Sequence, residues 1–259
     1  MKNFKDRITL TKNGRGCYII DTVKGCKYNC YGDCYAKNIA NRYKINFIKP
    51  VKRSFYKDTR QLFLFGFYDT KHENKIIRDI EKIDMPFVRI GEMGDPSESW
   101  EHTIDVCKII SKAKKKIVII TKHWNELSEN LLNEIKRLDI TINTSVSALD
   151  NVHERDYRIF QYHRLKNYCN SVLRIVSCDF NKSNCEGRAK SEIQKELFKN
   201  ENVIDTVFRP SKQNLLVLNG VIKVKKVKFL KQNVLASVYN KNTYFSGCKN
   251  CPEKCGITA

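Results

Sequence analysis

The sequence predicts an α/β protein built on a mostly parallel sheet, and two observations carry that prediction. From residue 86 onward, short apolar runs of strand length alternate with segments whose apolar residues recur with a helical period. Upstream, a further apolar run at 17–23 enters a loop rich in cysteine. Such a chain forms βαβ units with right-handed crossovers, and six units in 259 residues suit a partial (β/α)6 TIM-like barrel.

The elements can be assigned in order. The predicted strands are 17–23, 86–91, 116–121, 140–147, 172–177 and 203–208. The predicted helices are 35–43, 100–113, 128–138, 156–168 and 186–199. Ligands of parallel sheets bind at the C-terminal ends of the strands, and the cysteine loop follows the first strand at that end.

Two segments depart from this alternation within a predicted core of residues 1–210. An irregular basic and aromatic insertion at about 42–75 either packs into the core or presents a surface that stacks bases. Residues 211–259 form a second segment, in which 215–224 is expected to be a β-hairpin turning at Asn219-Gly220. The lysines that follow belong either to a solvated edge strand or to a phosphate-contacting strip: Lys223, Lys225, Lys226, Lys228 and Lys231.

Composition indicates the cellular location of the protein and the kind of partner that it binds. The 48 Lys and Arg residues against 28 Asp and Glu give a formal charge of +20, which attracts phosphate groups and predicts a nucleic-acid or nucleotide partner. No run of about 18 apolar residues is present, so no membrane span is expected. The first residues lack the apolar region of a signal peptide, which places the protein in the cytoplasm. There, the 11 cysteines are expected to be metal ligands and buried thiols.

Three of these cysteines, Cys26, Cys30 and Cys34, are each four residues from the next. Three thiolates in so short a loop hold three irons of a [4Fe-4S] cluster and leave the fourth iron open for chemistry. A zinc knuckle is the competing interpretation, but structural zinc needs four closed ligands and no local Cys or His completes the set.

The stretch Gly25-Cys-x3-Cys-x3-Cys-Tyr-Ala36 resembles the cluster loop of radical S-adenosylmethionine (radical SAM) enzymes, most closely in the spore photoproduct lyase-like branch. The usual spacing there is Cys-x3-Cys-x2-Cys. This chain has one extra residue, and Asp33 stands where an aromatic residue usually precedes the last cysteine. The resemblance implies reductive cleavage of the cofactor to a 5′-deoxyadenosyl radical, with flavodoxin or ferredoxin as electron donor.

Other segments resemble the family in the same order, over roughly residues 15–210. Gly91 and Glu92 occupy the place of its Gly-Gly-Glu-like turn, which binds the amino group of the cofactor. Lys122 ends a buried strand, as does the lysine that meets the cofactor carboxylate. Ser145 and Ser147 share one face of the next strand, where the family serine touches ribose or carboxylate, and Arg174 is a looser match.

A second motif, Cys-x2-Cys-x3-Cys, ends the chain. Cys248, Cys251 and Cys255 predict a second metal site, either an auxiliary [4Fe-4S] cluster or zinc. Cys178 or Cys185 is a candidate fourth ligand.

Together these features predict a radical SAM enzyme that modifies or repairs a nucleic-acid base. The lyase branch donates hydrogen from a cysteine near the second strand end, whereas the turn here contains no thiol, which argues against direct dimer repair. Two alternatives remain: a radical SAM enzyme that modifies peptides or proteins with an auxiliary cluster, and a non-catalytic, metal-stabilised nucleic-acid-binding protein.

Overall fold

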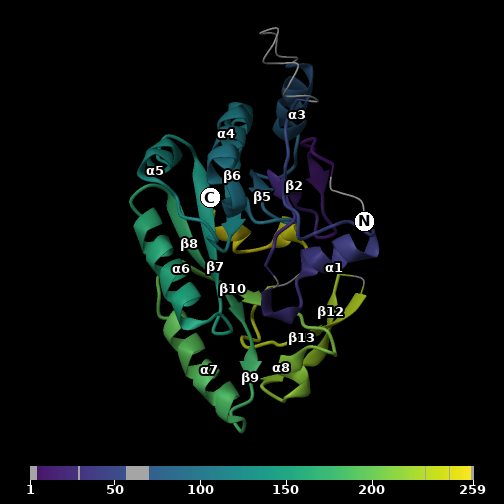
Figure 1. Ribbon diagram of the computed structural model, residues 1–259, viewed down its shortest axis with the longest axis vertical. Helices are drawn as coiled ribbons and strands as arrows, with labels where there is room; N and C mark the ends of the chain where they lie inside the picture. Colours follow the sequence, from purple (N-terminus) through teal and green to yellow (C-terminus); the bar gives the residue numbers. More distant parts are fainter. Residues whose placement is uncertain (1–4, 29, 57–69, 231, 245, 258–259) are drawn as a thin grey trace. The chain divides into compact units, whose positions relative to one another are not determined.

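The computed structural model describes residues 5–28, 30–56, 70–230, 232–244 and 246–257 (Figure 1). The chain forms two compact units. The first contains Met1–Tyr28 and Ala36–Thr141, and the second contains Asn29–Tyr35 and Ile142–Ala259. The second unit therefore includes a short piece of the N-terminal cysteine loop.

The first unit carries the strands β1 (Thr11–Lys12), β2 (Tyr18–Ile20), β5 (Phe87–Ile90) and β6 (Lys116–Thr121), in the order β1-β2-β5-β6. Strand β1 is antiparallel to β2, whereas the pairs β2–β5 and β5–β6 are parallel. Every residue of β5 and most residues of β6 are buried, as expected for parallel strands covered on both faces. A separate antiparallel pair joins β3 (Val23–Lys24) to β4 (Val51–Lys52).

The helices of this unit follow the amphipathic pattern of the sequence. They are α1 (Tyr35–Arg42), whose first residue belongs to the second unit, α3 (Lys71–Glu81), α4 (Trp100–Ile110) and α5 (Glu129–Ile135). In α4, Ile104, Cys107 and Ile110 are buried at helical spacing. Ser128 caps α5 by accepting a hydrogen bond from the Leu131 amide.

The second unit carries β7 (Ile140–Val146), which begins just before the boundary, followed by β8 (Asn170–Ser177) and β10 (Val203–Val207). The order is β7-β8-β10, and β8 and β10 are parallel. Helices α6 (Val152–Leu165) and α7 (Cys185–Leu197) run beside these strands (Figure 1). They contribute to an apolar cluster made of Val146, Tyr162, Leu173, Ile175 and Leu197.

The hairpin prediction for 215–224 is wrong. The side-chain oxygen of Asn214 accepts a hydrogen bond from the Leu216 amide, which starts the short helix α8 (Leu215–Leu218), and Gly220 follows with a positive φ of 63°. Strand β11 (Ile222–Lys223) then pairs with β9 (Asp179–Phe180). The C-terminal hairpin lies later in the chain, where β12 (Lys225–Phe229) pairs with β13 (Gln232–Ala236).

The predicted alternation of strands and helices is confirmed, and the protein is an α/β protein with mostly parallel sheet strands. Of the predicted insertion at about 42–75, residues 57–69 lie outside the described residues, as does Lys231. The division at 210/211 stays a prediction. None of the helices in the described ranges is both long and apolar enough to pass through a bilayer.

Gly94 tests how closely the backbone packs beside β3. A Cβ atom at this position would lie 2.6 Å from the Val23 carbonyl oxygen and 2.8 Å from the Gly25 carbonyl oxygen. We expect Gly94→Ala to lower the free energy of unfolding by about 1–3 kcal/mol, because backbone atoms cannot move aside cheaply. Gly14, with nothing within 4 Å, supplies the matched control Gly14→Ala. Equal stability of the two variants in urea unfolding would contradict this packing.

Candidate functional site

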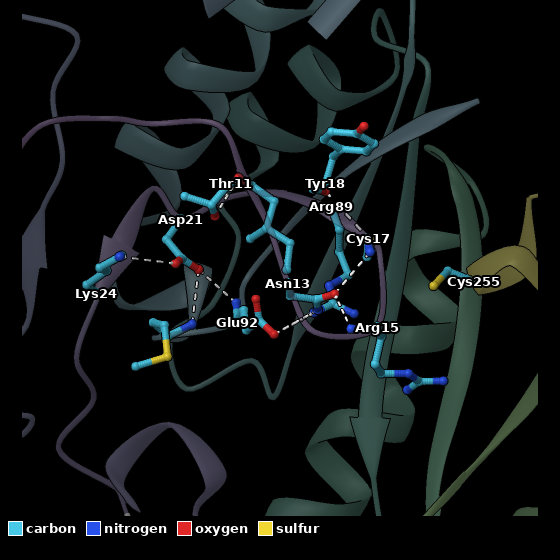
Figure 2. Close-up of polar contacts among 12 residues, drawn as sticks. Thr11, Asn13, Arg15, Cys17, Tyr18, Asp21, Lys24, Arg89, Glu92 and Cys255 are labelled. Atoms are coloured by element: carbon cyan, nitrogen blue, oxygen red, sulfur yellow. Dashed lines mark hydrogen bonds and ion pairs between the residues drawn. The ribbon is translucent and has the colours of Figure 1, made fainter. Parts of the chain in front are cut away.

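The turn after β5 is shaped by a carboxylate that follows β2. Asp21 is buried, and its Oδ1 accepts hydrogen bonds from the amides of Glu92 (2.8 Å) and Met93 (3.0 Å), as Figure 2 shows. Bonds from backbone amides to a carboxylate are charge-assisted and strong. Lys24 lies 3.8 Å from the other oxygen of Asp21. The end of one parallel strand thereby sets the backbone of the turn that follows its neighbour.

The Glu92 side chain is held from two sides. Its Oε1 accepts a hydrogen bond from Asn13 Nδ2 (2.9 Å) and lies 3.4 Å from Arg89 Nη2 (Figure 2). Asn13 is itself fixed, because its own oxygen accepts bonds from the amides of Arg15 and Cys17. Glu92 is thus an oriented carboxylate at the C-terminal end of the parallel strands.

Cys26 lies against the same turn. The Gly25 amide donates to the Met93 carbonyl oxygen (2.8 Å), and the Cys26 amide donates to that of Phe47 (2.8 Å). The Cys26 thiol is 3.9 Å from Oε1 of Glu98. Burial, followed by the charge of Asp95, raises the pKa of the Glu98 carboxyl above its ordinary value, although Lys27 opposes the shift.

The end of β6 is tied to the turn by Asp95. Its two oxygens accept hydrogen bonds from Thr121 Oγ1 (2.7 Å) and from the Lys122 amide (2.8 Å). Asp95 also caps the short helix Pro96–Ser99 by accepting a hydrogen bond from the Ser97 amide. Within the first unit, the structure therefore gathers Cys26, the Gly91-Glu92 turn and the mostly buried Lys122.

A stacked aromatic pair adds a second link between the cysteine loop and β6. Tyr28 lies two residues after Cys26, and Trp124 lies two residues after Lys122. Their ring centroids are 3.7 Å apart and the rings are inclined by 13°. Stacking of two large rings adds to what their burial alone contributes, so the loop and the strand end support each other.

In the second unit, Ser147 is part of the loop that follows β7. Its hydroxyl donates to the Val176 carbonyl oxygen (2.7 Å), and its amide donates to Asp150 Oδ2 (2.7 Å). Ser145, two residues earlier and still on β7, is 8% exposed. Of the two predicted serines, Ser147 therefore has a clear structural task, and both are buried.

The part of the cysteine loop that carries Cys30 and Cys34 is anchored by its unusual residue. Oδ2 of Asp33 accepts hydrogen bonds from the Ser211 amide (2.9 Å), the Ser211 hydroxyl (3.1 Å) and Asn214 Nδ2 (2.7 Å). Asn214 Nδ2 also donates to the Tyr31 carbonyl oxygen (2.9 Å). We call Asp33, Ser211 and Asn214 the Asp33 clamp. Apart from the unusual Asp33 itself, no local sequence pattern indicates this clamp.

Tyr31, between the same two cysteines, is a second anchor. Its hydroxyl donates to Asp150 Oδ1 (2.8 Å), and Asp150 forms a buried ion pair with Arg158 at 2.7 Å. The ring meets Phe208 edge to face, with centroids 5.8 Å apart. Burial and the neighbouring Asp150 charge raise the pKa of Tyr31 well above its ordinary value, so the phenol remains a hydrogen-bond donor.

One of the tail cysteines, Cys255, lies beside Arg174, which the sequence suggests as a cofactor ligand. The guanidinium donates to Thr206 Oγ1 (2.6 Å) and Asn143 Oδ1 (3.3 Å), and its Nη2 is 3.5 Å from Cys255 Sγ. The Cys255 carbonyl oxygen accepts a bond from Asn143 (3.0 Å). Arg174 is thus engaged with the C-terminal segment.

In the part of the chain that the structure describes, the cysteines do not come together in the sets that the sequence predicts as metal ligands. Cys178 is fully buried in an apolar cluster with Phe180 and Phe208, and Cys185 is the exposed first residue of α7. The described residues include all eleven cysteines, and none of these forms a disulfide. Cys26 belongs to the first unit, whereas Cys30 and Cys34 belong to the second. Across the described residues, no group of three Cys, His, Asp or Glu side chains converges as a metal site.

Comparison with known proteins adds no family to this description. The chain matches none of the protein-family models, and a search of curated proteins returns no match.

The Asp33 clamp makes a quantitative prediction. Asp33→Ala removes the acceptor of three hydrogen bonds, and we expect it to lower the free energy of unfolding by about 2–3 kcal/mol. Asp33→Asn keeps one acceptor oxygen and should be destabilised clearly less. Amide hydrogen exchange over residues 30–35, followed by mass spectrometry, should accelerate in the order wild type, Asn variant, Ala variant. Exchange that is the same in all three proteins would show that the clamp does not order this segment.

Proposed function

We propose that this protein is a radical SAM enzyme whose catalytic [4Fe-4S] cluster is held by Cys26, Cys30 and Cys34. The observation that carries the proposal is the cysteine motif followed, in order, by the Gly91-Glu92 turn and Lys122. The chemistry of the donor set suits the group, because none of the three cysteines is in a disulfide and a four-iron cluster with an open iron needs three thiolates. The grouping of Cys26, Glu92 and Lys122 within one unit supports the same assignment.

The chain's own residues would bind and orient the cofactor. When bound, the cluster and S-adenosylmethionine supply the hard chemistry, a 5′-deoxyadenosyl radical that takes a hydrogen atom from the substrate. Glu92 offers an anchored carboxylate to an amino group, and Lys122 offers a cation to a carboxylate. Asp21 and Asp95 keep Glu92 and Lys122 in place, because their carboxylates accept hydrogen bonds from the backbone of the turn and of Lys122. Ser145 is the proposed contact to ribose or carboxylate.

We extend the proposal to the fold and to the tail. Parallel strands alternating with helices in both units support a partial (β/α)6 barrel as the scaffold. Cys248, Cys251 and Cys255 are proposed to hold a second metal centre, either iron–sulfur or zinc. The Cys251 amide donates to the Cys248 carbonyl oxygen (3.2 Å), a tight turn that brings two ligand positions into one short segment.

Charge supports a nucleic acid as the substrate. Residues 206–252 contain no Asp or Glu, and their nine basic residues are Arg209, Lys212, Lys223, Lys225, Lys226, Lys228, Lys231, Lys241 and Lys249. The lysines of β12 are exposed, and the Arg209 guanidinium lies 4.8 Å from the centroid of the Phe229 ring. Cations beside an aromatic ring suit a phosphate backbone and its bases. The tail cysteines favour a second candidate, a peptide-modifying enzyme with an auxiliary cluster.

Cofactor cleavage tests the enzyme assignment. We expect anaerobically reconstituted wild-type protein with dithionite and S-adenosylmethionine to release 5′-deoxyadenosine, and Cys30→Ala to reduce the yield at least a hundredfold. Cys169→Ala removes a partly exposed cysteine that belongs to neither proposed ligand set and should behave as wild type. If the wild-type protein yields no 5′-deoxyadenosine, the chain is a metal-stabilised binding protein rather than a radical SAM enzyme.

Salt dependence tests the substrate class. Each neutralised phosphate contributes about 0.9 to the slope of log K against log salt for duplex DNA, so replacing Lys225, Lys226 and Lys228 with Ala should flatten the slope in proportion to the number of phosphates that these lysines neutralise. The control replaces three exposed or partly exposed lysines elsewhere in the second unit, Lys166, Lys195 and Lys199. A wild-type slope near zero excludes a polynucleotide substrate and favours the peptide-modifying alternative.

A further inference from the structure

Two large aliphatic side chains stand out from the short helix α8. Leu215 is 69% exposed and Leu218 is 64% exposed. They are three residues apart and therefore share one side of the helical turn. Leu216 and Val217, between them, instead pack against the buried cluster that contains Phe180 and Phe208. The helix therefore packs against the protein through Leu216 and Val217. Its two exposed leucines, Leu215 and Leu218, form an apolar surface that we call the α8 patch.

The surroundings of the α8 patch are basic. Arg209 and Lys212 are exposed and precede the helix, and Lys223 is exposed after it. The patch lies in the part of the sequence, 206–252, that contains no Asp or Glu. An apolar centre with a charged rim is typical of a protein interface. A positive rim selects a partner whose own surface is acidic.

One side chain connects α8 to the cysteine loop. Asn214 caps the helix by accepting the Leu216 amide at 3.0 Å through Oδ1. Its Nδ2 donates to the Tyr31 carbonyl oxygen and to Asp33. Tyr31 and Asp33 both lie between Cys30 and Cys34. A protein bound to the α8 patch would therefore be adjacent to the segment that carries two of the three proposed cluster ligands.

We propose that the α8 patch is the docking site for an acidic electron-transfer protein of the flavodoxin type. This inference rests on the proposed function, because that reaction consumes one electron for each cofactor cleaved. The anionic flavin hydroquinone gives up one electron and becomes the neutral semiquinone, and the electron passes to the oxidised cluster without a proton changing hands. Exposed leucines favour a protein over a nucleic acid, which binds through cations and aromatic stacking.

Binding provides the first test. Isothermal titration of reduced flavodoxin into the anaerobically reconstituted protein should give a dissociation constant that rises at least tenfold in the Leu215→Ser/Leu218→Ser double variant. Phe160→Ser, which removes a 57% exposed aromatic residue on α6, is the matched control and should bind as wild type. The charge reversal Arg209→Glu/Lys212→Glu should weaken binding without touching the leucines. Wild-type affinity in both patch variants overturns the proposal.

Electron delivery provides the second test, and it separates the two hypotheses. With flavodoxin as reductant, the double leucine variant should release 5′-deoxyadenosine at least tenfold more slowly than wild type. With dithionite, the two proteins should be equal. Wild-type protein that is inactive with dithionite refutes the enzyme assignment, whereas the titration still decides docking. Loss of duplex DNA binding, or of a dimer seen by sedimentation, in place of flavodoxin binding assigns the patch to another partner and overturns the proposal.

Discussion

Aspartate side chains that accept backbone amides hold the loops of this protein at their positions. Asp21, which follows β2, accepts hydrogen bonds from two amides of the turn after β5. Asp95, which lies in that turn, accepts a hydrogen bond from the Lys122 amide after β6. Asp150 accepts the Ser147 amide after β7, and Asp33 accepts the Ser211 amide. The loops at the ends of parallel strands have no ladder partners, so a charged acceptor from the same loop or from another loop supplies the missing bonds.

The residues that fix the loops of the candidate site differ from the residues that we assign to ligand binding. In the first unit, Asp21 and Asp95 accept hydrogen bonds from backbone amides, and we assign Glu92 and Lys122 to a ligand beside Cys26. In the second unit, Asp150 serves Ser147, Tyr31 and Arg158 together. A buried carboxylate with three partners is costly to disturb, because removing one partner leaves its charge uncompensated.

The sequence predicted what depends on neighbouring residues and missed what depends on distant ones. Strands and helices were predictable because burial periodicity is local, as in α4 and β6. At 215–224, Asn219-Gly220 is a genuine turn signal, but the Asn214 cap competes with it and produces a helix. The partners of Asp33 lie 178 and 181 residues away, which no local pattern reports. The candidate site stays a prediction from motif order, whereas the contact of Arg174 with the tail required the fold.

Arg174 shows how the tail and the sheet of the second unit depend on each other. Its guanidinium joins Asn143 on β7, Thr206 on β10 and Cys255 in the tail. Asn143 in turn binds the Cys255 carbonyl oxygen, and Asn170 binds that of Gly256 (2.8 Å). A metal held by the tail would therefore be tied to the strands through Asn143, Arg174 and Asn170. On the proposed assignment, the second metal centre then contributes to the stability of the whole second unit.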